Sequence, residues 1–145
     1  MNKDRLKRYK EKLEYLDKRI ENLKEWISNI KENEFIKKSA LQERYSIYHA
    51  FQIAVEVIMD ITAMMVKDEN IIPKDDYSNI DVLKERNIIK SDICPKIKEA
   101  NGLRNRIVHD YNGLNDSIAY ERLFELMKIF KTFEREVNKW LKKNY

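Results

Sequence analysis

Apolar residues repeat at alternating intervals of three and four along the first thirty positions of the chain. The repeat runs through Leu6, Tyr9, Leu13, Leu16, Ile20, Leu23, Ile27 and Ile30. This spacing places the apolar side chains on one narrow face of a long helix. A helix with such a face is stable only when the face is buried against other elements. The opening of the sequence therefore predicts a packed, helical protein.

The chain is also poor in residues that make turns. It has 145 residues but only two glycines and two prolines, whereas strands need frequent turns of that composition. Charged residues make up 37% and hydrophobic residues 43% of the chain, as in a patterned globular protein. The length suits one domain, and we expect residues 1–145 to form it. The lone Cys94 excludes an internal disulfide.

A second long helix is expected after the pattern loosens at residues 29–33. Ser39, with Gln42 three positions later, has the spacing of a capping box that opens a helix. The predicted helix fades near Lys67, and the pair Met64 and Met65 is assigned to the core. Its expected buried positions are Leu41, Tyr45, Tyr48, Phe51, Val55, Ile58, Ile61 and Met65.

Three further helices follow the polar connector at residues 68–76. Ser78 or Asn79 is expected to cap a short helix that ends at Arg86. Ser91 is expected to cap the next helix, which tolerates Pro95 in its first turn and stops at residues 110–113. A last helix starts at Asn115 or Asp116, and its expected buried residues are Leu123, Met127, Phe130, Phe133, Val137 and Trp140. The predicted fold is all-α, an antiparallel four-helix bundle with one additional short helix.

The most informative string for function is Leu-Arg-Asn-Arg-Ile-Val-His-Asp-Tyr-Asn at residues 103–112. Arg104 is a permanent cation that can grip a phosphate. His109 is one of only two histidines, and histidine exchanges protons near neutral pH. Together the two side chains are sufficient for metal-free cleavage of a phosphodiester, so we expect no metal or other cofactor.

The string Arg-x4-His-x-Tyr resembles the signature of HEPN domains and, more narrowly, of the HepT family of ribonuclease toxins. Asn105 fits that pattern, and residues 44–56 are similar to the family's second helix, so the resemblance covers most of the chain. The resemblance implies a HEPN-like fold and a metal-independent endoribonuclease that forms a homodimer. It also implies that a minimal nucleotidyltransferase antitoxin transfers AMP to Tyr111 and so silences the nuclease.

The geometry of a straight helix separates the two proposed catalytic residues. Arg104 and His109 are five positions apart, which places them about 140° apart around the helix axis. The helix can end near His109 and re-aim it, or the site can be built from two copies of the chain. The family resemblance implies the second arrangement.

The expected reaction is transesterification of RNA. A histidine removes the proton of the ribose 2′-OH, that oxygen attacks the adjacent phosphate, and a second histidine or a water protonates the leaving 5′ oxygen. Arg104 stabilises the charge on the phosphate in the transition state. Asn105 supports the site by orienting the histidine or holding a phosphate oxygen. Tyr111 lines the pocket.

Other polar residues have structural interpretations that we favour over functional ones. His49 is interpreted as a partly buried histidine with satisfied hydrogen bonds. Glu56 and Asp60 lie four apart on one helical face, which indicates a polar core or dimer contact in preference to a metal site. Arg44 is left open between pairing with a nearby acid and contacting RNA.

Composition gives only weak information about partners. The formal net charge of +4 permits an acidic partner such as RNA, although interspersed lysine and glutamate usually indicate a solvated surface. The N-terminus begins directly in charged helix, and no apolar run approaches the about 20 residues of a membrane span. We therefore expect a cytoplasmic protein without membrane contact. The alternatives to a nuclease are a non-catalytic HEPN module that binds nucleotide or scaffolds a nucleotidyltransferase, and a plain helical interaction protein.

Overall fold

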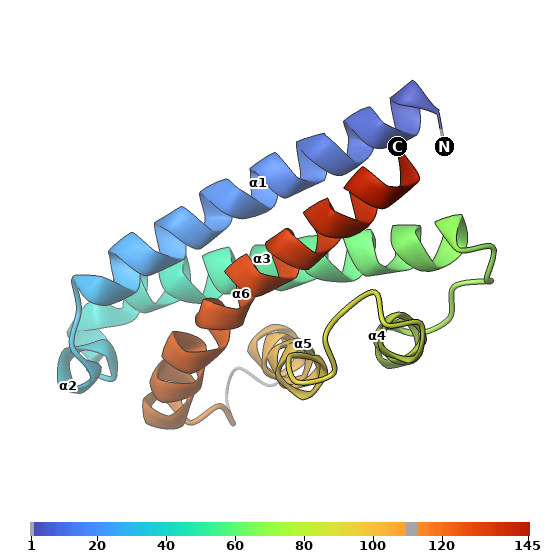
Figure 1. The fold of residues 1–145 in the computed structure, drawn as a ribbon. Helices are drawn as coiled ribbons and strands as arrows, with labels where there is room; N and C mark the ends of the chain where they lie inside the picture. The colour runs from blue at the N-terminus through green and yellow to red at the C-terminus, as the bar shows by residue number, and fades with distance from the viewer. Residues whose placement is uncertain (1, 110–112) are drawn as a thin grey trace.

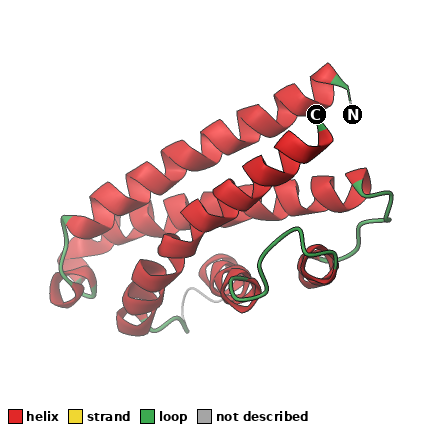
Figure 2. Cartoon of the chain, in the orientation of Figure 1, coloured by secondary structure: helices red, strands yellow, loops and turns green. Residues whose placement is uncertain are grey.

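The computed structural model of the chain describes residues 2–109 and 113–145. Figure 2 shows helices joined by loops, with no strand in the described part. Four long helices carry the fold: α1 (Lys3–Ser28), α3 (Leu41–Asp68), α5 (Cys94–His109) and α6 (Asp116–Asn144). Three shorter elements are α2 (Glu32–Phe35), the 3₁₀ turn η1 (Lys38–Ala40) and α4 (Asp76–Glu85). The all-α class predicted from the sequence is confirmed.

The long helices pack around one core. In Figure 1, α1 runs antiparallel to α3 and to α6, and α5 is seen nearly end-on, so it crosses the others. Helix α5 packs against both α3 and α6. The predicted apolar face of α1 is buried from Tyr9 to Ile27, and all six residues predicted for the last helix are buried. Met64 and Met65 also lie in the core, as expected.

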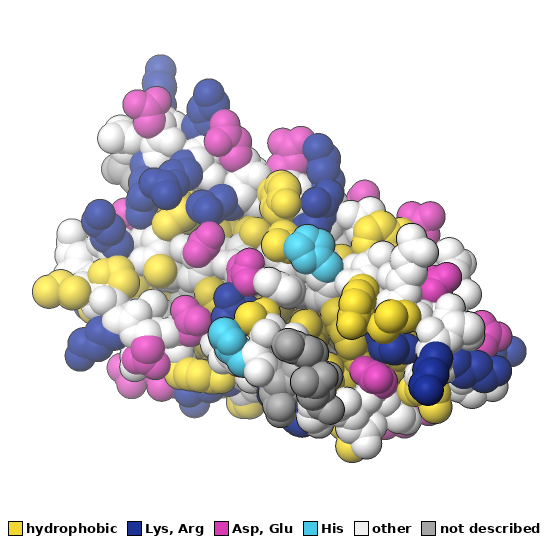
Figure 3. All heavy atoms as spheres, turned by 180° about the vertical axis from the view of Figure 1, so that it is seen from behind, with side chains coloured by type: hydrophobic (Ala, Val, Ile, Leu, Met, Phe, Trp, Pro, Cys, Tyr) yellow, Lys and Arg dark blue, Asp and Glu magenta, His cyan; other side chains and the backbone are white. Residues whose placement is uncertain are grey.

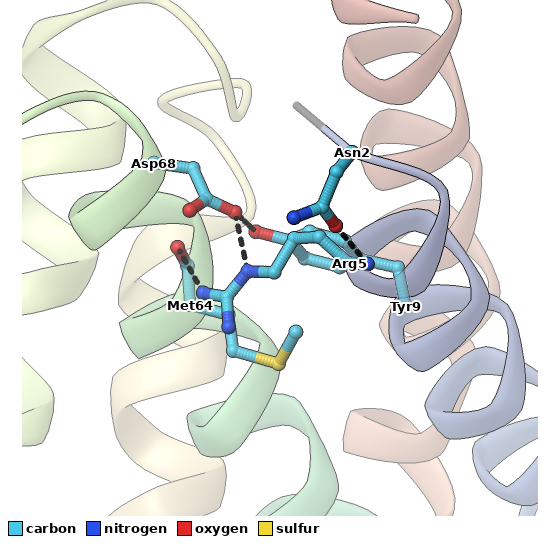
Figure 4. A network of polar contacts seen from close by, with 5 residues as sticks. All are labelled: Asn2, Arg5, Tyr9, Met64 and Asp68. Atoms are coloured by element: carbon cyan, nitrogen blue, oxygen red, sulfur yellow. Dashed lines mark hydrogen bonds and ion pairs between the residues drawn. The ribbon is translucent and has the colours of Figure 1, made fainter.

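A polar cluster fastens the start of α1 to the end of α3 (Figure 4). The Tyr9 hydroxyl donates a hydrogen bond to Asp68 at 2.6 Å, and Arg5 Nε donates to the same carboxylate oxygen at 2.9 Å. Arg5 also donates to the Met64 carbonyl at 3.3 Å. Burial and the Asp68 carboxylate raise the pKa of Tyr9, so the tyrosine stays a neutral donor. The cluster therefore ties the N-terminal end of α1 to the C-terminal end of α3.

Arg44, which the sequence left open between pairing with an acid and contacting RNA, has a structural role. Its side chain is 9% exposed, and its Nη1 donates to the Phe35 carbonyl at 2.7 Å and to the Lys37 carbonyl at 3.0 Å. Its Nε lies 3.6 Å from the Asp116 carboxylate at the start of α6. Buried carbonyls need donors, because an unsatisfied one costs about 1–3 kcal/mol. Arg44 therefore ties the connection between α1 and α3 to the start of α6.

The structure corrects several expected helix starts. The Ser39 capping box is wrong, because η1 leads directly into α3 and Ala40 occupies the cap position without a side-chain hydrogen bond. Asp75, not Ser78 or Asn79, caps α4 by accepting from the Ser78 amide at 3.4 Å. Ser91 lies in a turn three residues before α5 begins at Cys94.

Other local expectations have mixed outcomes. Asn115 caps α6 as predicted, through the Ile118 amide at 3.0 Å. The four-residue helix α2 was not expected. Leu41 and Tyr45 were assigned to the buried face of α3, but they are 44% and 59% exposed. They lie in the first turns of α3 on its exposed side, whereas Arg44 and Ile47 in the same turns are buried.

One described segment reaches the apolar character of a membrane span. Lys38–Asp68 has a mean hydropathy of 1.4 over its most apolar window, against our expectation that no stretch would approach such a length. In the structure 67% of that window is buried inside the protein. Packing between α1, α4 and α5 accounts for the apolar side chains, as in the central helix of a bundle.

Candidate active site

Helix α5 carries the Arg-x4-His string across the bundle. Pro95 sits in its first turn, where its missing N–H is tolerated, and the helix continues to His109. Ile97 and Ala100 are buried on its inner face. Asn101 is also buried, and its Nδ2 donates to Asp76 at 3.4 Å. These contacts fix the rotation of α5 and so decide where the next residues of the string point.

Arg104 turns inward, toward α3. Its Nη2 donates to Oε1 of Glu56 at 2.9 Å, and its Nη1 donates to Oδ1 of the adjacent Asn105 at 2.7 Å. Gln52, one turn earlier on α3, donates from Nε2 to the same Glu56 oxygen at 3.1 Å. The Arg104 side chain is 25% exposed and that of Glu56 is 34% exposed. The guanidinium is therefore oriented by two oxygens and still reaches the surface.

Among residues 2–109 and 113–145, the guanidinium of Arg104 keeps N–H donors that have no acceptor. It carries five N–H groups in a fixed plane, and the contacts to Glu56 and Asn105 occupy one hydrogen on each terminal nitrogen. The Nε atom is buried without a partner. One N–H on each terminal nitrogen is left for a further acceptor such as a phosphate oxygen. Arg104 is thus held in place by two hydrogen bonds while some of its N–H donors stay without an acceptor in the described structure.

His109 is exposed at the last residue of α5. No hydrogen bond joins it to Arg104 in the described structure, in agreement with the wide angle between the two positions on one helix. The described part of α5 runs to His109. Tyr111, the expected site of modification, lies outside the described residues.

The expectation for His49 is wrong. It was interpreted as a partly buried histidine, but it is exposed on α3. Figure 3 shows histidine side chains (cyan) on the same face of the molecule, and the chain has only His49 and His109. His49 lines a pocket of about 400 Å³ between α3, the end of α5 and the start of α6. Gln52 lines the same pocket and also holds Glu56.

Glu56 and Asp60 do not act as a pair. Glu56 contacts Arg104, whereas Asp60 is exposed and accepts from Lys12 on α1 at 3.3 Å. The described residues contain no group of three histidine, cysteine, aspartate or glutamate side chains close enough to hold a metal ion. The two carboxylates therefore form two separate ion pairs, and the expected dimer contact stays a prediction.

Comparison with known proteins gives the family. The profile of the family described as "Ribonuclease HepT-like" matches residues 16–137, which include α3 and the whole of the Arg-x4-His-x-Tyr string. The chain belongs to the HepT-like ribonuclease family. Two proteins of Archaeoglobus fulgidus, each named "Putative RNase", are similar to it. One is 38% identical over 130 residues, covering 88% of this chain and 89% of the relative. The other is 35% identical over 97 residues, covering 67% and 74%.

Solved structures share the HepT-like fold. A tri-AMPylated HEPN toxin of Shewanella oneidensis, solved in complex with an MNT antitoxin, superposes with a TM-score of 0.81 at 21% identity, covering 96% of this chain and 99% of that one. A toxin–antitoxin structure with AMP-PNP gives a TM-score of 0.74 at 19% identity, covering 94% and 99%. At these identities the likeness establishes the HEPN fold.

Sequence reasoning missed the partners of Arg104 in this HepT-like protein. Gln52 and Glu56 are four residues apart, a spacing that places them on one helical face. That signal was present, but nothing in the sequence indicates that this face of α3 meets α5 at Arg104. The exposed position of His49 beside Gln52 was missed for the same reason.

Proposed function

We propose that this HepT-like protein is an endoribonuclease that cleaves RNA by transesterification without a metal ion, with Arg104 and His109 as its catalytic residues. The observation that carries the proposal is the Arg104 guanidinium. Glu56 and Asn105 orient it while one N–H on each terminal nitrogen stays available. Membership of a ribonuclease family supports RNA as the substrate.

The reaction needs one base, one acid and one cation. His109 removes the proton from the ribose 2′-OH, and the 2′ oxygen attacks the adjacent phosphorus. The bond to the 5′ oxygen breaks as the 2′,3′-cyclic phosphate forms, and a second histidine or a water protonates the departing 5′ oxygen. Arg104 donates to the phosphate oxygens, whose negative charge is greatest in the transition state. Asn105 Oδ1 accepts a hydrogen bond from Arg104 Nη1 and so helps to orient the guanidinium.

The proposal includes control by an antitoxin. A structurally similar HEPN toxin is tri-AMPylated and bound to an MNT antitoxin, and another similar structure is a toxin–antitoxin with AMP-PNP. The Arg-x4-His-x-Tyr string places Tyr111 two residues after His109. An AMP group on Tyr111 adds negative charge and bulk next to the proposed catalytic histidine, so it would compete with the RNA phosphate.

The nuclease proposal is tested with purified variants on single-stranded RNA. His109→Ala and Arg104→Ala should each lower the cleavage rate by about 10²–10⁴-fold, because each removes a group that acts in the transition state. Arg106→Ala is the matched control, since Arg106 is an exposed arginine on the same helix and should leave the rate unchanged. EDTA should have no effect, and DNA of the same sequence should stay uncut because it lacks the 2′-OH.

The outcomes separate the nuclease from its alternatives. Thermal unfolding of each variant shows whether the substitution leaves the fold intact. Full activity in folded His109→Ala, or activity lost with chelator, would place the chemistry elsewhere. An inactive wild-type protein that still binds nucleotide or a nucleotidyltransferase would favour the non-catalytic HEPN module.

The control proposal is tested by intact-mass spectrometry. Incubation with ATP and a cognate minimal nucleotidyltransferase should add one or more AMP units to the wild-type protein and stop cleavage. Tyr111→Phe should gain no mass and should keep cutting RNA in the presence of the antitoxin, because the accepting hydroxyl is gone. An adduct that persists on Tyr111→Phe would refute the assignment.

A further inference from the structure

A pocket of about 400 Å³ opens beside the proposed catalytic arginine, and the nuclease mechanism leaves it unused. Its rim on α3 carries Tyr45 and His49, which lie one helical turn apart and are both exposed. The Tyr45 side chain is 59% exposed, so an aromatic ring stands in water where burial would be favourable. Ile107 of α5 and Leu114 before α6 form its apolar wall.

The floor of the pocket is rigid. Arg44 is committed to the carbonyls of Phe35 and Lys37, and the Tyr48 hydroxyl donates to the Asp116 carboxylate. Burial, together with Asp116, raises the pKa of Tyr48, which keeps it a neutral donor. These groups already have partners, so a ligand in the pocket meets a fixed surface.

One residue joins the pocket to the catalytic arginine. Gln52 lines the pocket and donates to Glu56 Oε1 at 3.1 Å. The same oxygen accepts from Arg104 Nη2 at 2.9 Å. A phosphate held by Arg104 would therefore be separated from the pocket by the Gln52 and Glu56 side chains, and the base of a bound nucleotide could enter the pocket.

We propose that this pocket binds a nucleobase of the RNA next to the phosphate that is cleaved, with the base stacked against Tyr45 and His49. The inference rests on the proposed nuclease function for the position of that phosphate. A volume of about 400 Å³ lies within the range of small-molecule sites and admits a base with its ribose. Because the rim is aromatic and the wall is apolar, we expect stacking to contribute more to base binding than hydrogen bonds do. Stacking accepts every base, so the pocket should show little sequence preference.

Nucleotide binding tests the pocket independently of cleavage. The probes are the four 5′-nucleoside monophosphates, with ribose 5-phosphate as the probe that lacks a base, titrated into folded His109→Ala protein and followed by NMR. The monophosphates should shift the resonances of Tyr45, His49 and Ile107. Ribose 5-phosphate should bind at least about 10-fold more weakly, since a stacked base contributes affinity of that order.

Variants of the rim supply the second measurement. Tyr45→Ala and His49→Ala, each in the His109→Ala background, should weaken monophosphate binding by about 10-fold. Tyr15→Ala is the matched control, because Tyr15 is an exposed tyrosine on α1 outside this pocket, and it should leave binding unchanged. With otherwise wild-type protein and short RNA substrates, Tyr45→Ala should raise KM and leave kcat within about twofold.

Each outcome decides between the two proposals. Equal affinity for ribose 5-phosphate and the monophosphates, or undiminished monophosphate binding in folded Tyr45→Ala, overturns the nucleobase site. Monophosphate binding that depends on Tyr45 in a protein that cleaves no RNA supports the pocket and overturns the nuclease. RNA cleavage that depends on His109 but is indifferent to Tyr45 and His49 overturns the pocket and leaves the nuclease in place.

Discussion

At the scale of single residues, the position of Arg104 depends on an acid from another helix. The Glu56 carboxylate neutralises the guanidinium and aims it, and Gln52 steadies the carboxylate. A positioning residue of this kind matters because misplacing a catalytic group by about 1 Å can cost about 10²-fold in rate. In the proposed mechanism, contacts within one chain therefore orient Arg104 before a phosphate binds.

We expect Glu56→Ala to lower kcat by about 10- to 100-fold, because Arg104 loses the acceptor that orients it. Glu56→Gln should retain much more activity, since its amide oxygen still accepts from the guanidinium. Asp60→Ala removes the neighbouring carboxylate on the same helix, which pairs with Lys12, and should leave kcat unchanged. Steady-state kinetics of the three variants checks this, and equal losses for Glu56→Ala and Asp60→Ala would contradict it.

At the scale of elements, the contact between α1 and α6 contains a carboxyl group with an altered pKa. The Glu134 side chain on α6 is 14% exposed, and its Oε1 is buried with no hydrogen-bond partner in the part of the chain that the structure describes. Burial, more than any other factor, raises its pKa to about 7, while Lys131 opposes the rise and Asp17 of α1 adds to it. Lys131 also hydrogen-bonds Asp17 and so lowers the pKa of that aspartate.

The raised pKa of Glu134 predicts a dependence of stability on pH. The folded protein holds this proton up to about pH 7, whereas an unfolded glutamate releases it near pH 4.5. Protonated Glu134 contributes its full stabilisation below about pH 4.5, and this stabilisation is lost as the pH rises through about 7. The loss in the free energy of unfolding is at most about 1.4 kcal/mol for each unit by which the folded and unfolded pKa values differ. Glu134→Gln should abolish this loss and be more stable than wild type at pH 8.

Urea unfolding at several pH values checks the prediction. Glu125→Gln, on an exposed carboxylate of α6 that pairs with Lys128 at 3.1 Å, is the control and should follow the wild-type profile. A Glu134→Gln profile that is parallel to wild type between pH 4.5 and 7 would mean that Glu134 is ionised in the folded protein throughout.

At the scale of the whole molecule, the separation of Arg104 from His109 favours a site shared by two copies. Arg104 donates to Glu56 of α3, and His109 is exposed at the last described residue of α5, with no hydrogen bond between the two side chains. We therefore predict a two-fold homodimer in which both motifs face one groove, so that the arginine of one copy works with the histidine of its partner. Light scattering should give twice the chain mass of 17.6 kDa at micromolar concentration.

A mixture of inactive variants tests the shared site directly. Arg104→Ala and His109→Ala, unfolded and refolded together, should regain activity that neither has alone, because a mixed dimer keeps one arginine and one histidine across its groove. A fully active monomer would contradict the prediction. The expectations of one domain over residues 1–145 and of a cytoplasmic location stay predictions at this scale.

The sequence by itself determined the features that arise within one helix. The apolar stripes of α1 and α6 are confirmed because the period of 3.6 residues is a property of the local backbone, whatever the helix packs against. The position of the Arg-x4-His string near the end of α5, and the cap at Asn115, are local in the same sense. The family resemblance rested on such a string and is confirmed.

Only the tertiary structure decided which faces meet. The spacing of Gln52 and Glu56 marks a helical face, but their contact with Arg104 depends on how α5 crosses α3. His49 was wrongly predicted to be partly buried, because it lies with Tyr45 on the exposed side of α3 while the adjacent Ile47 and Tyr48 are buried. The Ser39 cap failed because a 3₁₀ turn, held by the buried Arg44, feeds directly into α3. The contact of Glu56 with Arg104 joins residues distant in sequence, for which no local periodicity carries a signal.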